Sequence, residues 1–544
     1  MPGVKERRSF GNTLKDCIVS IHRASLLLCL AASTASAQTA FVQVLRGDTV
    51  VVEKFTRTAT RLDVTLAAKG AGLQYLTSEI GTGGSLGALT LTVLAPGAAA
   101  GAAPMITATA SVTGDTAIAV IERGGPPQTQ RIPTKVGAQP VATNVLAYIE
   151  TMLLAVRRAK SATATITTFS IVNGQTSTLT FANALSDSVT ISAGPSMVFV
   201  IADSTGRVQR GGTADGTLVF SRVDGVAVTK LAFAKPDYSA PGGAPYTAES
   251  VTVPTPLGHT LGGTFTKPTG VTTRLPAVIS ISGSGPQDRD EYISLVRNGY
   301  RLFRQVADTL GRRGVAMLRM DDRGVGESGG NFATATSRDF ANDIRAAVTY
   351  LRSRPDVDAS RIFLVGHSEG GLIAPMVALD EPSLAGIVLM AGPGRTGREI
   401  LQFQNRYAIE HDTTLTPAKR SEMLASMPKM LDSALRSTPW LTFFGAHDPL
   451  ATARKVKVPV LILQGADDQQ VIAAEAPLLA KAFRAGGNRD VTMQVFPELN
   501  HFFIRQPGGA PAGYSTLPTN LASAEVLGLA TDWIVRRVSH GARP

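Results

Sequence analysis

The chain has 544 residues, of which 44% are hydrophobic and 17% charged, and a formal net charge of +11 at pH 7. This composition is typical of soluble globular proteins and argues against a disordered chain, and the length indicates about two to four domains. The basic residues do not cluster with interleaved aromatic side chains, which argues against a nucleic-acid partner. The positive charge predicts only loose attraction to anionic surfaces.

Residues 1–37 have the pattern of a secretory signal peptide. The pattern begins with the basic residues Lys5, Arg7, Arg8, Lys15 and Arg23. The apolar run "ASLLLCLAA" follows, and the small residues "ASA" end at Ala37. The run is too short to cross about 30 Å of hydrocarbon as a helix. We therefore expect a secreted or periplasmic protein, without a stable membrane span once the leader is removed.

Both cysteines of the chain, Cys17 and Cys29, lie in this leader. Leu28 is bulky where lipoproteins have a small residue before the modified cysteine, so the leader does not indicate lipidation. A mature chain without cysteine has no disulfide, no thiol nucleophile and no cysteine metal site. Its stability must therefore come from burial of apolar side chains.

Residues 38–240 are rich in Thr, Val, Ala and Gly and contain many runs of alternating polarity, such as "ALTLTVLA" and "SATATITTFSIV". Alternation with a period of two between glycine and aspartate turns predicts an antiparallel sheet. One helix is expected at about 141–159, with an apolar stripe formed by Val145, Ile149, Met152 and Val156. The region has no histidine. We interpret it as a β-rich accessory domain.

A different pattern follows a linker at 241–250 that is rich in proline and glycine. From 251 to 544, a predicted hairpin is followed by short apolar runs that alternate with helical patterns. The runs lie at 276–281, 314–320, 361–366, 385–391, 458–464 and 491–496, and the helical patterns at 292–312, 338–353, 369–379, 470–485 and 520–538. Buried strands that alternate with helices predict an α/β fold, with a mostly parallel sheet flanked by helices. The helix-prone insertion at about 394–440 is expected to form a cap.

The pattern Gly-x-Ser-x-Gly occurs three times, around Ser85, Ser328 and Ser368. A nucleophile elbow needs a buried strand before the serine and a helix directly after it, whose N-terminus supplies N–H groups. An alternating strand pattern follows Ser85, and Ser328 lies between loop segments. Only Ser368 follows a buried run, "RIFLVG", and precedes a helical pattern. Pro375 lies about two turns into that helix, which predicts a bend or an early end there.

A triad on this type of elbow has the chain order serine, acid, histidine, with each residue in a loop after a strand. Asp467 and Asp468 closely follow the run "VPVLILQG", and His501 follows "VTMQVFPELN". These positions lie past the carboxyl ends of predicted strands, where such sheets bind ligands. The candidate catalytic residues are therefore Ser368, His501 and one of the two aspartates. Three other histidines do not fit the order or lie in the tail: His411, His447 and His540.

An oxyanion hole needs two N–H donors close to the nucleophile. One is expected from the residue after the serine, Glu369, and the other from the loop after the third strand of the sheet. That loop, "ISGSGPQDRDE", directly follows "PAVIS" and is free of large side chains at its start. We expect Ser284 to be the second donor, with Gly283 as the next candidate.

Six separated segments occur together in one order: "PAVISISGSGPQDRDE", "LRMDDRGVGESGGNFATAT", "VGHSEGGLIAP", "VLMAGPG", "VPVLILQGADDQQV" and "FPELNHFF". They resemble secreted bacterial α/β-hydrolases, carboxylesterases with a serine-aminopeptidase-like or dienelactone-hydrolase-like catalytic domain. The resemblance covers about 248–540. It implies that Asp468, in the "DQQV" context, is the acid and that His501 is the histidine of the triad. We interpret Asp322 and Arg323, in "DDRGVGES", as residues that tie loops together.

The expected fold is thus an α/β-hydrolase fold with a helical cap, at 251–544, preceded by the β-rich domain. The expected function is hydrolysis of small-molecule carboxylic esters through an acyl-enzyme on Ser368, and no cofactor or metal is implied. Five cap residues are expected to line the acyl pocket or to pack the cap itself: Phe403, Tyr407, Met423, Met427 and Met430.

Two alternatives stay open at this point. An aminopeptidase or amidase would use the same triad and would bind the amino terminus of a peptide through an acidic residue such as Glu369 or Asp288. An envelope binding protein would use the β-rich domain as its active part and would carry a vestigial hydrolase domain.

Overall fold

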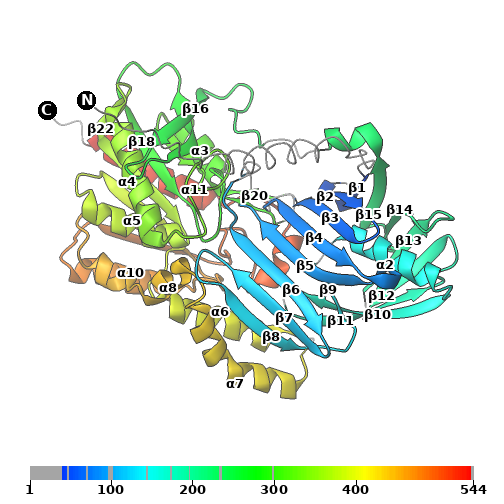
Figure 1. The fold of residues 1–544 in the computed structure, drawn as a ribbon. Helices are drawn as coiled ribbons and strands as arrows, with labels where there is room; N and C mark the ends of the chain where they lie inside the picture. Colours follow the sequence, from blue (N-terminus) through cyan, green and yellow to red (C-terminus); the bar gives the residue numbers. More distant parts are fainter. Residues whose placement is uncertain are drawn as a thin grey trace, which may run out of the picture.

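A computed structural model describes residues 39–540, apart from short gaps at 46–47, 69–71, 96–97, 99–101, 143–144, 172–173, 195, 232–235, 297–298 and 414. The predicted signal peptide therefore lies outside the described residues. Figure 1 shows two parts, a large curved sheet in blue to green and a layered domain in green to red. No helix within the described ranges is long and apolar enough to cross a membrane.

The N-terminal part is a single sheet of 15 strands. Strands β1 to β8 follow one another to one edge, and β15 back to β9 follow one another to the other edge, so that β1 pairs with β15 in the middle. The strands are β1 (Thr39–Leu45), β2 (Asp48–Arg57), β3 (Arg61–Ala68), β4 (Gln74–Ile80), β5 (Leu86–Val93), β6 (Ile106–Thr113), β7 (Thr116–Glu122), β8 (Gln128–Pro133), β9 (Gln139–Val141), β10 (Thr163–Ser170), β11 (Thr176–Ala182), β12 (Ser188–Ala193), β13 (Ser196–Ala202), β14 (Val208–Gly212) and β15 (Leu218–Asp224).

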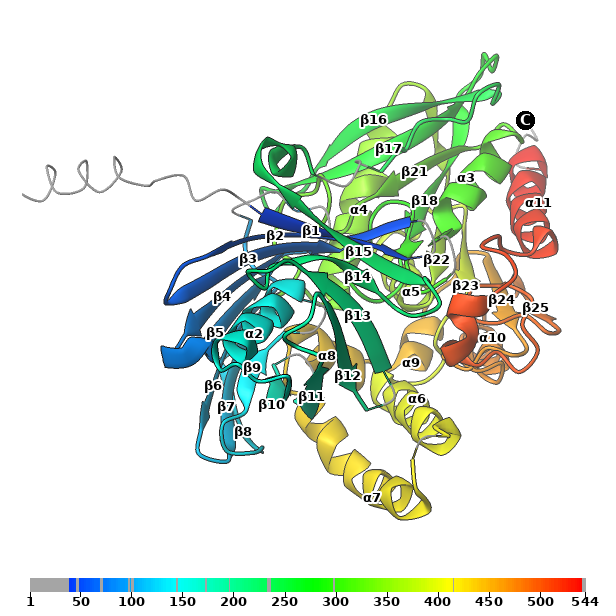
Figure 2. The same cartoon turned by 90° about the vertical axis from the view of Figure 1, so that its right-hand side faces the viewer.

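The sheet bends around the helix α2 (Leu146–Arg158), which lies inside its curve in both views (Figures 1 and 2). Tyr148, Met152 and Val156 are buried there against the inward side chains of the sheet. The backbone N–H groups of Leu146 and Ala147 each donate to the carboxylate of Glu53, at 2.7 Å, and so the sheet caps the helix. The helix predicted at about 141–159 thus begins five residues later than expected.

The C-terminal part contains an eight-stranded sheet in the order β16-β17-β21-β18-β22-β23-β24-β25. β17 runs antiparallel to both of its neighbours, and the strands from β21 to β25 are parallel. The strands are β16 (Tyr246–Pro254), β17 (Thr260–Pro268), β18 (Leu275–Ile281), β21 (Ala316–Met320), β22 (Val357–His367), β23 (Gly386–Met390), β24 (Val460–Gly465) and β25 (Val491–Phe496). β16 begins inside the predicted linker 241–250, because Tyr246 already pairs with Pro268 of β17.

Helices cover both faces of this sheet, as its continuous apolar strands require. The helices α3 (Leu302–Gly311) and α11 (Ala524–His540) share a core with one face. The helices α4 (Ser337–Ser353), α5 (Glu369–Asp380) and α10 (Glu475–Ala485) share a core with the other. The helix expected at 292–312 is shorter than predicted, since Tyr292–Ile293 (β19) and Tyr300–Arg301 (β20) form a small hairpin, with Gly299 at a φ of 72°.

The insertion at 394–440 is helical. It contains α6 (Gly397–His411), α7 (Pro417–Ala434) and the start of α8 (Pro439–Ala446), and α9 (Pro449–Ala453) leads from it to β24. Figure 2 shows α7 projecting away from the body of the molecule. α5 runs through Pro375 as one helix, so the predicted early helix end does not occur.

Candidate active site

Ser368 lies in the tight turn between β22 and α5, where its backbone has φ 53° and ψ −118°. Few residues with a side chain adopt this conformation, and it costs about 1–3 kcal/mol. The turn needs glycine on both sides of the serine: a Cβ atom at Gly366 would lie 2.1 Å from the carbonyl oxygen of Gly370, and one at Gly370 would lie 2.0 Å from that of Ile281. The local structure is that of a nucleophile elbow.

The other two serines of the same pattern have no such setting. Ser328 is buried, donates its hydroxyl proton to the carbonyl oxygen of Asp321 and accepts from the N–H of Gly262, so it ties two loops together. Ser85 ends a short 3-10 helix and is followed directly by β5.

His501 lies in the loop after β25, and its Nδ1 is 2.7 Å from Oδ2 of Asp468. Asp468 is only 1% exposed. Its Oδ1 accepts from the backbone N–H groups of Gln470 and Val471, and Oδ2 also accepts from the side-chain amide of Gln464 at 3.0 Å. These donors fix the carboxylate in the orientation that a catalytic histidine needs.

Asp467 has no such arrangement. Its backbone N–H donates to the carbonyl oxygen of Leu499, and its side chain is half-buried and makes no hydrogen bond to His501. Of the two aspartates that the spacing left open, the structure therefore brings Asp468 to His501.

The loop after β18 begins with Ser282 and approaches the elbow. The N–H of Gly283 is bonded to Oε1 of Glu291, at 2.8 Å, so it is not free to donate to an oxyanion in this structure. The N–H of Ser284 has no acceptor among the described residues. Glu369 is the first residue of α5, and its N–H therefore has no acceptor within the helix. Ser284 and Glu369 thus remain as the candidate donor pair.

The chain is similar in sequence to several known proteins. Residues 298–507 match the model of a family described as "Serine aminopeptidase, S33". The chain is 28% identical over 288 residues to the esterase EstD of Thermotoga maritima, which covers 52% of this chain and 65% of that protein. It is 29% identical over 236 residues to the dipeptidyl aminopeptidase BIII of Pseudoxanthomonas mexicana, which covers 42% of this chain and 31% of that protein.

The C-terminal part has the α/β-hydrolase fold, and it is called the hydrolase domain below. The fold predicted from the sequence is thereby confirmed, with its β-rich N-terminal part. Among solved structures, an esterase of Pyrococcus furiosus, Pf2001, is 19% identical with a TM-score of 0.37, over 56% of this chain and 97% of that chain. The chain spans less than two thirds of the length of the two curated relatives named above.

The side chain of Glu369 in the hydrolase domain is buried and fully engaged. It accepts from the hydroxyl of Ser337 at 2.6 Å, from the indole N–H of Trp440 in the cap at 2.8 Å, and from Ser284. Burial raises the pKa of this carboxyl, and the three hydrogen bonds oppose that rise. The carboxyl of Glu369 thus already has three hydrogen-bond donors, two of them on Oε1.

Asp288, the other proposed anchor, is also occupied. It accepts from the N–H groups of Asp290 and Tyr292 and from the hydroxyl of Tyr238, and it pairs with Arg301. It does not line the active-site pocket. Of the two carboxyls named as possible anchors, Asp288 thus lies outside the pocket, and Glu369 lines it but is bonded to other side chains.

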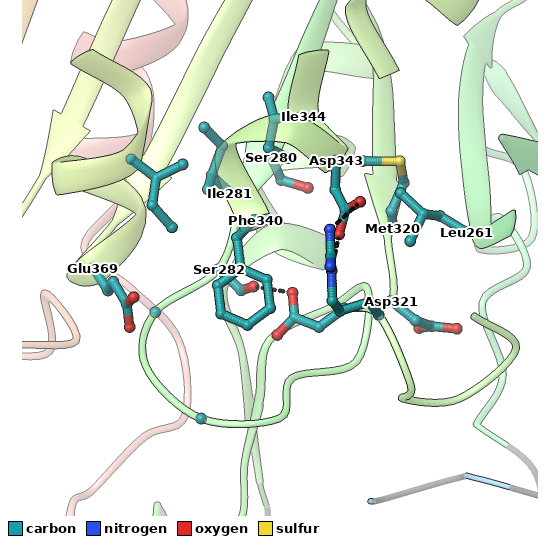
Figure 3. A pocket seen from close by; sticks show the side chains of 15 residues that line it. Leu261, Ser280, Ile281, Ser282, Met320, Asp321, Phe340, Asp343, Ile344 and Glu369 are labelled. Carbon is teal, nitrogen blue, oxygen red and sulfur yellow. Dashed lines mark hydrogen bonds and ion pairs between the residues drawn. The ribbon is translucent and has the colours of Figure 1, made fainter. Parts of the chain in front are cut away.

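Asp322 holds the loop after β18, which begins with Ser282 and carries Ser284; this loop is called the oxyanion loop below. Its carboxylate accepts from the hydroxyl of Ser282 at 2.8 Å and from the N–H of Gln287 at 3.0 Å. Figure 3 shows Ser282 and Glu369 among the residues that line a small cavity of about 30 Å³, the room of one water molecule. Asp322 thus ties two loops together, as predicted, whereas Arg323 pairs with Asp343 of α4 at 2.7 Å and ties its loop to that helix.

Ser368, His501 and Ser284 open onto one large pocket of about 1070 Å³ between the sheet and the cap. Its apolar lining includes Ile293, Leu295, Leu401, Tyr407, Phe444 and Tyr514. Of the five cap residues considered, Tyr407 lines the pocket, while Met430 is 66% exposed and Met427 is buried within the cap. Phe403 packs against Tyr407, with ring centroids 6.1 Å apart.

Sequence reasoning missed several residues that support the site. Gln464 and Trp440 have no sequence signal, because their partners Asp468 and Glu369 become neighbours only through the fold. Glu291 is likewise brought to His367 across 76 positions of the chain. His367 lies inside the elbow pattern, directly before the serine, and its position alone could have drawn attention to it.

Proposed function

We propose that this protein is a serine hydrolase that cleaves carboxylic esters of small molecules through an acyl-enzyme on Ser368. One observation carries the proposal: Ser368, in a strained elbow, lines the same pocket as His501, and Nδ1 of His501 lies 2.7 Å from Oδ2 of the buried Asp468. The 28% sequence identity to the esterase EstD of Thermotoga maritima supports the same activity.

The residues act in two steps. His501 removes the proton of the Ser368 hydroxyl as the serine attacks the ester carbonyl, and Asp468 stabilises the imidazolium that forms. The N–H groups of Glu369 and Ser284 donate to the oxyanion. His501 then protonates the leaving alcohol, and in the second step it removes a proton from water, which hydrolyses the acyl-enzyme.

The pocket favours an ester over a peptide. Its lining is largely apolar, and the two carboxyls considered as anchors for an amino terminus, Glu369 and Asp288, are satisfied by other groups. A peptide ammonium would therefore find both of these carboxyls already bonded to other groups, which disfavours its binding there.

The experiment is a comparison of p-nitrophenyl esters of acids of two to twelve carbons with aminoacyl p-nitroanilides, using wild-type protein and Ser368→Ala. We expect turnover of the esters that Ser368→Ala abolishes, and much slower turnover of the anilides. Faster turnover of the anilides would instead support an aminopeptidase or amidase.

We further propose that the protein acts outside the cytoplasm, on the strength of the leader pattern at residues 1–37. N-terminal sequencing of protein from the producing cells should find Gln38 as the first residue, and an N-terminus that keeps the basic leader would contradict export by this signal.

A further inference from the structure

The histidine that precedes the nucleophile is buried and bonded on both sides. His367 is 1% exposed, and its Nε2 lies 3.0 Å from the backbone carbonyl oxygen of the catalytic histidine, His501. Its Nδ1 lies 2.8 Å from Oε1 of Glu291, which is also 1% exposed. The two histidine rings are close, with centroids 4.9 Å apart.

These contacts fix the number of protons on the pair. A carbonyl oxygen only accepts, so Nε2 of His367 must carry a hydrogen. A second hydrogen must lie between Nδ1 and Oε1, because a contact of 2.8 Å between two bare acceptors would be repulsive. Oε1 already accepts from the N–H of Gly283, which favours a carboxylate over a carboxylic acid. Both hydrogens then belong to the imidazole.

We propose that Glu291 and His367 form a buried carboxylate–imidazolium pair that positions both the catalytic base and the oxyanion loop. His367 donates to the backbone of His501, and Glu291 accepts from the backbone of Gly283, the residue before the donor Ser284. The pair therefore links the backbone of the catalytic base, His501, to the loop that carries the oxyanion donor Ser284. Its role in turnover rests on the proposed hydrolase function, and its protonation does not.

The surroundings of the pair agree with a charged imidazole. Burial alone would lower the pKa of His367, but the charge and hydrogen bond of Glu291, the carbonyl of His501 and the charge of Asp468 raise it above its usual value. Two further titratable side chains lie beside the pair, His501, whose ring centroid is 4.9 Å from that of His367, and Tyr300. Burial beside Glu291 raises the pKa of the Tyr300 phenol, so it remains neutral. Phe502 and Phe503 complete the shell around the ring.

The pair acts through other residues, so Glu291 and His367 are positioning residues. In Glu291→Gln, the neutral amide cannot balance an imidazolium, and His367 must release one proton. One hydrogen bond of the network is then lost. If the amide oxygen faces Nδ1, His367 no longer donates to His501; if the amide N–H₂ faces Nδ1, the N–H of Gly283 loses its acceptor. Misplacement of reacting groups by about 1 Å can cost up to about 100-fold in rate.

The first measurement is the protonation of His367 by NMR, in Ser368→Ala protein labelled with ¹⁵N-histidine. The chain has seven histidines, and comparison with a His367→Asn spectrum assigns the resonance. We expect both ring nitrogens of His367 to be protonated at pH 7.5, and Glu291→Gln to remove one of those protons. If one ring nitrogen of His367 is unprotonated at pH 7.5 in protein that keeps Glu291, the two residues do not form a carboxylate–imidazolium pair. This result does not depend on any substrate.

The second measurement is the rate at which a fluorophosphonate labels Ser368, from pH 6 to 10. We expect Glu291→Gln to be labelled about 10- to 100-fold more slowly than wild type. We also expect the decline of its labelling rate at alkaline pH to begin at a lower pH than in wild type, because His367 without the Glu291 carboxylate loses its proton at a lower pH. Glu475→Gln removes another buried carboxylate, one that contacts Gly394 and Arg395 and not the triad. Its pH profile should match that of wild type. Equal rates and profiles for all three proteins would contradict a positioning role.

Discussion

At the scale of single residues, the site depends on groups that are held before substrate arrives. Asp468 accepts four hydrogen bonds, of which only one is to His501. The other three come from the backbone and from Gln464, so the carboxylate cannot turn away from the histidine. Such fixed orientation is how an acid partner selects the correct tautomer of a catalytic histidine.

Replacement of Asp468 by asparagine should therefore strongly reduce the rate of ester hydrolysis. An amide N–H directed at His501 would favour the wrong tautomer, and we expect kcat to fall by about 10³–10⁴ with little change in KM. The neighbouring change Asp467→Asn is the matched control, because Asp467 makes no hydrogen bond to His501. Steady-state kinetics with a p-nitrophenyl ester measures both. Equal losses in the two variants would mean that Asp468 is not the acid of the triad.

At the scale of elements, the sequence predicted most of what positions the triad. The six apolar runs are all strands of the second sheet. A strand buried on both faces leaves a continuous run that is easily recognised, and the edge strand β25, with alternate side chains exposed, is the exception. The hairpin of β19 and β20 was missed because it is short and rich in residues that a helix also accepts. The hydrogen bond from the N–H of Gly283 to Glu291 could not be predicted, because only the tertiary fold brings the Glu291 side chain to that N–H.

The cap helix α6 sets one wall of the pocket, and this gives a prediction about acyl length. Leu401 lines the pocket, whereas its neighbour Gln402 is exposed on the outer face of the helix. Leu401→Trp should reduce the space for the acyl chain, so that kcat/KM falls at least tenfold for an octanoate ester and far less for an acetate ester.

Gln402→Trp is the matched control, because it adds the same indole outside the pocket. An acyl-length profile of both variants, with p-nitrophenyl esters, makes the comparison. If Leu401→Trp has the chain-length profile of wild type, the acyl group does not occupy this side of the pocket.

At the scale of the whole molecule, the two parts have separate hydrophobic cores, one around α2 and two on the faces of the parallel sheet. Contacts between the segment before β16 and the hydrolase domain include the hydroxyl of Tyr238 on Asp288, and the guanidinium of Arg289 stacked 4.3 Å from the centre of the Tyr238 ring. Separate cores allow each part to respond differently to temperature and pH.

The β-rich part should lose stability as the pH rises. Burial raises the pKa of Glu53 from 4.5 to about 8, although its hydrogen bonds from Ala147 and Leu146 oppose this shift. A carboxyl whose pKa is higher in the folded state stabilises that state below its unfolded pKa, and the effect is lost as the pH rises through the folded pKa. The loss is on the order of a few kcal/mol.

Scanning calorimetry at pH 5, 7 and 9 tests this. We expect the melting transition of the β-rich part to move to lower temperature between pH 5 and pH 9. In Glu53→Gln, which cannot titrate, the shift should be much smaller. A wild-type transition that does not move with pH, or a shift that Glu53→Gln leaves unchanged, would show that Glu53 ionises without cost in the folded protein.

The central claim is that Ser368 is an activated nucleophile, and its most direct test is reaction of the folded protein with a fluorophosphonate, followed by intact mass and peptide mapping. The account predicts one adduct per chain, on Ser368, which is absent after heat denaturation and in His501→Ala. Folded wild-type protein without an adduct on Ser368, or labelling that persists in Ser368→Ala, would contradict it and would favour a binding protein with a vestigial hydrolase domain.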